Sequence, residues 1–235
     1  MSICAFTAVC EEDRVWIPQY LREVERLGVY FAVHFDRCSY ATKDMAGHRL
    51  CAGYTVQDLP NVEFNEMHKQ AVLDLVVTRG FRWALAWDID ETWERHAPEK
   101  LSTSTFQHPD AGIVPYDEIV VNWVNLWGDP QHVRVDRPSA GSRVKLLNLH
   151  SGRWLFDHPI TNGPKLQRAR CVVTGEVDLT CLHHGMMTPE LRALHKARWD
   201  RIYSTALRGD ENPYQFWKYM TDDAITPVIK ENTWL

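Results

Sequence analysis

The chain has 235 residues, of which 45% are hydrophobic and 24% charged, as in ordinary globular proteins. It contains no run of 18 apolar residues, which excludes a transmembrane helix, and no basic segment followed by an apolar one, so we expect no signal peptide and a cytoplasmic protein. The six cysteines include no Cys-x-x-Cys pair, and reduced thiols are expected.

The first half of the sequence predicts strands and helices in alternation. Apolar runs typical of buried strands are separated by segments with apolar residues at helical spacing. The expected order is strand 3–9, helix 11–27, strand 29–35, irregular 37–61, helix 64–78 and strand 82–87. This alternation indicates a parallel sheet flanked by helices, which is an α/β fold.

Acidic residues follow the predicted strands. Residues 83–91 read Trp-Ala-Leu-Ala-Trp-Asp-Ile-Asp-Glu, so an apolar strand ends in Asp88 and Asp90, while Glu11 and Asp36 follow the other two strands. Ligands of parallel sheets bind at the carboxyl ends of the strands. Paired carboxylates there suit Mg²⁺ or Mn²⁺, although acids at strand ends also serve as helix caps and turn formers.

The second half is less regular, and we expect one domain over 1–235. Its predicted elements are strands 119–127, 144–149, 171–173 and 177–181 and helices 188–207 and 212–219.

A histidine pair, His183 and His184, follows a predicted strand and precedes a basic helix. One imidazole could complete a metal site with Asp88 and Asp90, and we favour His183 over His184. The alternative is a loop pair bonded to backbone.

The stretch 134–170 is basic in an otherwise acidic chain. It holds eight Lys or Arg and two Asp, against a net charge of −5 for the whole sequence. Such asymmetry indicates an anionic ligand or a solvated face. Lys145 is our candidate for contact with a phosphorylated donor, and the stretch as a whole could follow a DNA backbone.

Three parts of the sequence carry a resemblance to a known family: the motif at 83–91, the opening Cys-Glu-Glu at 10–12 with Ile-Pro-Gln-Tyr-Leu at 17–21, and Cys-Leu-His-His-Gly at 181–185. They resemble family-two-type glycosyltransferases of the GT-A fold, especially small bacterial and phage members. Relatives usually carry Asn-Glu where this chain has Cys10-Glu11. The resemblance covers the ends and middle of the chain, and residues 95–170 match only loosely.

This resemblance implies that residues 1–92 form a nucleotide-sugar-binding half and residues 93–235 an acceptor-binding half with the C-terminal helices. It implies a nucleoside-diphosphate sugar as donor, with a UDP-sugar first, and Mn²⁺ or Mg²⁺ as the metal ion. It implies that Asp90 and one of His183 and His184 bind the metal ion. Asp88 would bind either the metal ion or the ribose, and Asp36 would face the nucleobase. Asp157 is our candidate for the base that deprotonates the acceptor. The acceptor could be hydroxymethylated DNA, a saccharide or a lipid. A metal-dependent phosphoesterase and a non-catalytic binding module are the competing classes.

Overall fold

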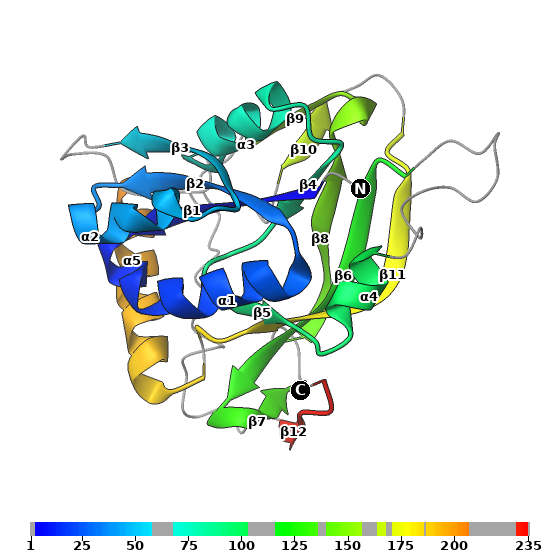
Figure 1. Cartoon of the computed structure of the whole chain (residues 1–235). Helices are drawn as coiled ribbons and strands as arrows, with labels where there is room; N and C mark the ends of the chain where they lie inside the picture. The colour runs from blue at the N-terminus through cyan, green and yellow to red at the C-terminus, as the bar shows by residue number, and fades with distance from the viewer. Residues whose placement is uncertain are drawn as a thin grey trace.

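The structure is a computed structural model that describes residues 3–57, 68–102, 116–135, 140–156, 164–167, 171–185, 187–206 and 229–234. Within these residues, ten strands form one sheet (Figure 1). Its order is β12-β7-β6-β8-β4-β1-β2-β3, with β11 beside β6 and β5 beside β11.

The parallel part of the sheet comes from the first half of the chain. β1 (Ile3–Cys10) lies between β2 (Tyr30–Asp36) and β4 (Trp83–Ala86), and β3 (Cys51–Gln57) continues beyond β2. All three pairings are parallel. The predicted α/β class, with parallel strands flanked by helices, is therefore confirmed.

Both faces of β1 are covered, which explains why all of its residues are buried. Alternation along the strand sends Ala5 into one core with α1 (Ile17–Leu27) and Phe6 into another with α3 (Lys69–Thr78). A strand buried on both faces reads as a continuous apolar run, which is why the sequence predicted it. Gly28, with φ +65°, ends α1 in the left-handed conformation that favours glycine.

Antiparallel strands extend the sheet on the side of β4. β8 pairs with β4, β6 pairs with β8, and β11 runs parallel to β6 and carries β5 on its other edge. Their bounds are β5 Glu91–Trp93, β6 Glu118–Trp127, β7 Asp129–Arg134, β8 Ala140–Asn148, β11 Thr174–His183 and β12 Ile229–Glu231. This path brings the end of β11 beside the turn that follows β4, where the His184 amide donates to the Asp90 carbonyl over 2.8 Å.

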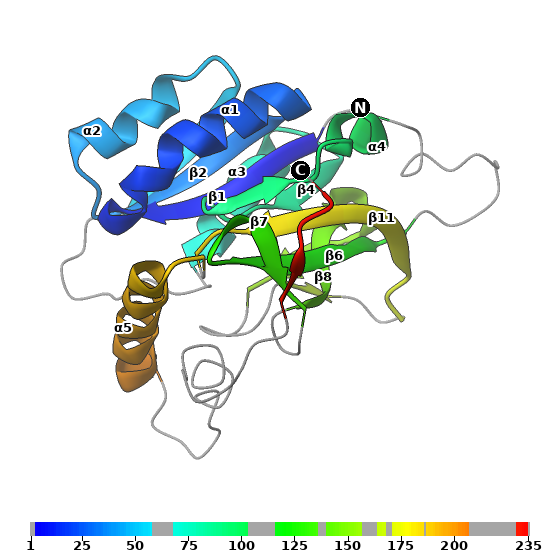
Figure 2. The same cartoon turned by 90° about the horizontal axis from the view of Figure 1, so that it is seen from below.

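The remaining elements are short apart from one helix. They are η1 Glu11–Trp16, α2 Tyr40–Lys43, η2 Asp44–Gly47, α4 Ala97–Ser102, η5 Leu149–Ser151, the hairpin β9 Arg153–Leu155 and β10 Lys165–Gln167, and α5 Pro189–Ala206. Figure 2 shows α5 at the edge of the molecule, projecting away from the sheet. None of the helices in the described segments has the length and apolar character that crossing a membrane requires.

Three expectations from the sequence were wrong in detail. Residues 37–57 are not irregular, because they contain α2 and β3, an edge strand whose partly exposed residues form no apolar run. Residues 58–61 of the predicted irregular segment lie outside the described residues. Residues 171–173 are not a strand, since β11 begins at Thr174. The helix predicted over 11–27 begins as a 3-10 turn. The helix predicted over 212–219 lies outside the described residues. None of the six cysteines, all of which are described, forms a disulfide in the structure.

Candidate metal centre

The site is built on the turn that follows β4. The Trp87 indole donates to the Glu91 carbonyl over 3.0 Å, and the Glu91 amide donates to the Asp88 carbonyl over 3.1 Å. These bonds close residues 87–91 into a compact turn at the carboxyl end of a parallel strand, which is the edge of the sheet where ligands bind.

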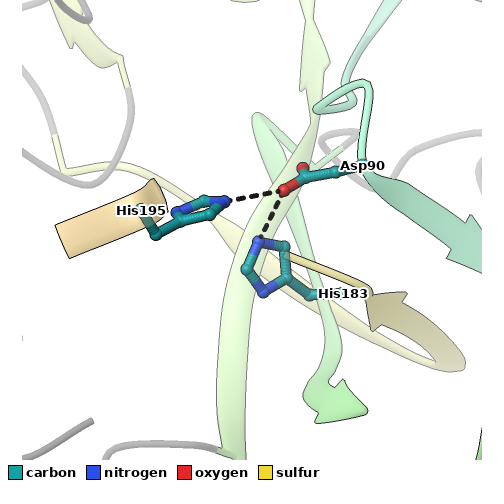
Figure 3. A group of neighbouring side chains, drawn as sticks. All are labelled: Asp90, His183 and His195. Carbon is teal, nitrogen blue, oxygen red and sulfur yellow. Dashed lines mark hydrogen bonds and ion pairs between the residues drawn. The ribbon is translucent and has the colours of Figure 1, made fainter. Parts of the chain in front are cut away.

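Two histidines from distant parts of the sequence lie beside the side chain of Asp90 (Figure 3). Its Oδ2 atom lies 3.1 Å from Nε2 of His183, at the end of β11, and 3.2 Å from Nε2 of His195, on α5. Asp90 and His183 are buried and His195 is partly buried. The three atoms form a group that could hold a metal ion.

His183 is oriented by its neighbours on β6. Its Nδ1 atom donates to Oδ1 of Asn125 over 2.5 Å, and Asn125 is its register partner in the β6–β11 pairing. The ring of Trp123 packs against the imidazole with centroids 5.1 Å apart. Since Nδ1 carries the donated proton, Nε2 is left to face Asp90 and, in turn, a metal ion.

Asp90 and His183 shift each other's pKa. Burial raises the pKa of the Asp90 carboxyl, but His183 and His195 lower it more, so that it lies well below its usual range. Burial lowers the pKa of His183, but Asp90 raises it more. Without a metal ion, proton and carboxylate neutralise each other, so a divalent ion must displace a proton to bind.

Gly185 forms one wall of the group. A Cβ atom added to it would lie 2.9 Å from Nε2 of His183 and closer still to the ligand atoms of Asp90 and His195. Only a residue without a side chain allows the backbone to approach so closely. The space beside the three ligand atoms is thereby kept clear, and the residues fit a bound cation.

The donor set restricts the kind of ion. The three atoms lie within 4.8 Å of one another, and small side-chain movements would bring them to metal–ligand distances of about 2.0–2.2 Å. One carboxylate with two imidazoles suits Mn²⁺, Fe²⁺ or Zn²⁺. Mg²⁺ prefers an all-oxygen shell, so the donor set favours Mn²⁺ over Mg²⁺.

Asp88 lies next to the group but is paired elsewhere. Its Oδ1 atom accepts a hydrogen bond from Nζ of Lys69, in the first turn of α3, over 2.7 Å. Burial raises the pKa of the Asp88 carboxyl, but Lys69 and Lys145 lower it more, to about 2. The two predicted carboxylates therefore have different partners, a lysine for Asp88 and the histidines for Asp90.

The His184 side chain is not part of the metal group. Its Nε2 atom lies 2.8 Å from the Thr92 hydroxyl, and its ring packs near Trp16. Burial lowers the pKa of His184 to about 4, so the ring is neutral at pH 7. Of the two predicted histidines, the structure brings only the His183 imidazole to the Asp90 carboxylate.

The other predicted donor-binding residues are each engaged within the protein. Glu11 accepts from the Ser39 amide over 2.8 Å and holds the start of α2. The Asp36 side chain is enclosed and pairs with Arg37 over 2.8 Å. Lys145 is buried and pairs with Glu91. Asp157, the predicted base, lies outside the described residues.

Among the residues of the basic stretch that the structure describes, the cations do not all lie on one charged surface. Arg134 is buried, with its guanidinium 4.6 Å from the centroid of the Trp127 ring, and Lys145 is buried as well. Arg143 is partly buried over Trp123. The charge count in the sequence could not distinguish such internal cations from exposed ones.

Sequence reasoning missed His195. It lies three residues after Arg192 and three before Arg198, on the same face of α5. Arg198 pairs with Asp13 over 2.9 Å, and Arg192 stacks on Trp127 at 4.1 Å. Over residues 189–198, where the structure describes the side chains of α5, none is buried, so polar contacts attach this part of the helix. This helical spacing of polar residues was the available signal.

Comparison with protein-family models and with curated proteins found no match. Among solved structures, the chain is similar to an active-site mutant of LgtC, with 13% identity and a TM-score of 0.30 over 63% of this chain and 57% of that one. It is also similar to mannose-1-phosphate geranyltransferase from Thermus thermophilus, with 11% identity and a TM-score of 0.33 over 63% of this chain and 50% of that one. The matched region thus spans about half of each of those chains, and the function must be argued from the site itself.

Proposed function

We propose that the chain is a metal-dependent glycosyltransferase that moves a sugar from a nucleoside-diphosphate sugar to an acceptor hydroxyl. The group of Asp90, His183 and His195 at the carboxyl end of a parallel strand carries this proposal. The resemblance of residues 83–91 and 181–185 to family-two-type glycosyltransferases supplies the donor class.

A divalent ion at this group, with Mn²⁺ as our first candidate, would neutralise the negative charge that develops on the nucleoside diphosphate as it leaves. Asp90 and His183 would bind the ion, and His195 would be the third protein ligand in place of the predicted Asp88 or His184. The Asn125 bond to His183 keeps Nε2 turned toward the ion.

Asp88 would bind the donor rather than the ion. Its side chain is 45% exposed, and Lys69 engages one of its oxygens. A pKa of about 2 keeps it a hydrogen-bond acceptor at neutral pH. We assign it to a ribose hydroxyl of a UDP-sugar. Asp36 would contribute to nucleobase binding through Arg37, because it pairs with the guanidinium group of that residue. Glu11 would contribute to the donor site by fixing the start of α2.

Our proposals for the acceptor and for the catalytic base rest on the sequence. Asp157 stays our candidate for the base that deprotonates the acceptor hydroxyl. Hydroxymethylated DNA, a saccharide and a lipid stay open as acceptors. Lys145 cannot reach a phosphate backbone from its buried position, so a DNA groove would depend on exposed residues such as Arg153.

A metal-dependent phosphoesterase is the second candidate. One carboxylate and two imidazoles fill only part of a metal's coordination shell and leave room for a reactive water. Such an enzyme needs no nucleoside pocket, and nucleotide binding therefore separates the two functions.

A thermal-shift series tests the proposal. UDP, GDP, ADP and CDP are each added with and without Mn²⁺ to the wild type, to Asp90→Asn and to Asp178→Asn, which removes a charge from an acid that is 89% exposed on β11. A glycosyltransferase should show a shift that needs both Mn²⁺ and one preferred nucleotide, present in the Asp178 variant and absent in the Asp90 variant. Stabilisation by Mn²⁺ with indifference to every nucleotide would favour the phosphoesterase.

A further inference from the structure

Glu91 directly follows the metal-binding turn and is 1% exposed. Nζ of Lys145, on β8, donates to both of its carboxylate oxygens over 2.7 and 2.6 Å. Both charges are buried, so each compensates the other. Such a pair adds little stability compared with apolar residues of similar volume, and its presence calls for another explanation.

The same carboxylate accepts two further hydrogen bonds. Oε2 accepts from the backbone amide of Asp88 over 3.0 Å, and Oε1 accepts from the indole nitrogen of Trp123 over 2.8 Å. The first bond fixes the start of the Asp88–Asp90 turn. The second fixes Trp123, whose ring packs against His183.

Glu91 therefore connects two segments that supply metal ligands. Its backbone is also the register partner of His183 in the β5–β11 pairing. Asp90 precedes it in the chain, and His183 lies across from it on the neighbouring strand. A shift of this carboxylate would move the Asp90 turn and the support of the His183 ring together.

We propose that Glu91, balanced by Lys145, is the positioning residue of the metal centre. It sets the relative placement of Asp90 and His183 without touching the ion. The inference rests on the proposed metal centre but needs neither nucleotide nor sugar transfer. Metal affinity depends on ligand placement to within about 0.2 Å, so losing this support should weaken metal binding more than folding.

Paired substitutions test this role without leaving a buried charge alone. Glu91→Leu with Lys145→Met removes the charges and both positioning bonds, whereas Glu91→Gln with Lys145→Met retains one acceptor oxygen. The control is Glu94→Leu with Lys100→Met, which removes another ion pair whose acid lies close to Glu91 in the chain. The charged atoms of this pair are 2.5 Å apart, and its carboxylate is mostly buried.

Isothermal titration with Mn²⁺ supplies the readout, with circular dichroism to confirm folding. We expect the Leu/Met variant to bind Mn²⁺ about 10- to 100-fold more weakly than wild type, as for other outer-shell partners of metal ligands. The Gln/Met variant should lie between, and the control should match wild type. Wild-type affinity in a folded Leu/Met variant would show that the pair is merely structural and would overturn the inference.

A milder variant covers the case in which the Leu/Met variant does not fold. Trp123→Phe keeps a ring beside His183 but removes the indole donor to Glu91. It should weaken Mn²⁺ binding several-fold, and unchanged affinity would count against the role. Failure of the wild type to bind Mn²⁺ would overturn both this inference and the metal centre, whereas Mn²⁺ binding without nucleotide binding would overturn the glycosyltransferase proposal alone.

Discussion

Gly185→Ala tests the metal centre with the smallest possible change. The added methyl group carries no charge and no hydrogen-bonding capacity, but its position coincides with the ligand group. Its carbon would lie 2.9 Å from Nε2 of His183 and closer still to the ligand atoms of Asp90 and His195. Any effect on metal binding therefore comes from geometry.

The required displacement follows from these distances. Optimal separations between non-bonded heavy atoms begin near 3.5 Å, so His183 must move by about 0.6 Å and the other two ligands by more. Such a shift is about three times the 0.2 Å within which metal–ligand distances are held. Overpacking of this kind costs about 1–3 kcal/mol of folding free energy. We expect a folded variant whose Mn²⁺ affinity is at least about 100-fold weaker.

Gly141→Ala, on β8, is the matched control, because a Cβ atom there meets nothing within 4 Å. Isothermal titration with Mn²⁺ and urea unfolding of both variants separate affinity from stability. The reasoning is refuted if Gly185→Ala binds Mn²⁺ as wild type does, since an ion held by these three ligands cannot tolerate the methyl group.

Four further predictions concern ionisation and the neighbouring side chains. Mn²⁺ affinity should fall as the pH drops through the raised pKa of His183, because the ion must displace the proton that Asp90 stabilises; titrations across pH measure this. Without metal, the stability from that pair is complete below about pH 6.5 and is lost as the pH rises through the folded pKa, which urea unfolding at several pH values checks. His184→Ala should leave Mn²⁺ affinity nearly unchanged while lowering the free energy of unfolding by about 1–3 kcal/mol, and a large loss of affinity would make it a ligand. Lys69→Met should raise the pKa of Asp88 from about 2, as followed by NMR titration of its carboxyl carbon, and an unchanged value would contradict the dominant role of that lysine.

The sequence predicted the features that depend on local patterns. The apolar run before Asp88 identified β4, and the end of a parallel strand placed Asp88 and Asp90 at a ligand-binding edge. His183 could be selected because it also follows a strand. Strand β3 was missed, since its partly exposed residues gain their strand structure from pairing with β2 rather than from an apolar pattern.

Features that depend on long-range packing could not be predicted. His195 contacts Asp90 only because the fold places α5 beside the turn that follows β4. Lys69 pairs with Asp88 only because the first turn of α3 lies beside that same turn. The positive charge of Lys145 suggested a ligand contact, but in the fold Glu91 neutralises that charge in an ion pair. Charge patterns indicate which groups need partners, and the tertiary fold decides which partners they receive.

The mode of attachment of α5 gives this part of the molecule its own response to solution conditions. Hydrophobic contacts hold the helices on the two faces of the sheet, whereas α5 is held by His195 and by the ion pair of Arg198 with Asp13, through side chains that are 21% and 20% exposed. Raising the salt concentration from 0.1 to 1 M shortens the Debye length from about 10 to about 3 Å, which weakens such pairs but leaves apolar packing intact. We therefore expect ionic strength to act on α5 more than on the helices that are packed by apolar contacts, and with it on the position of His195 beside Asp90.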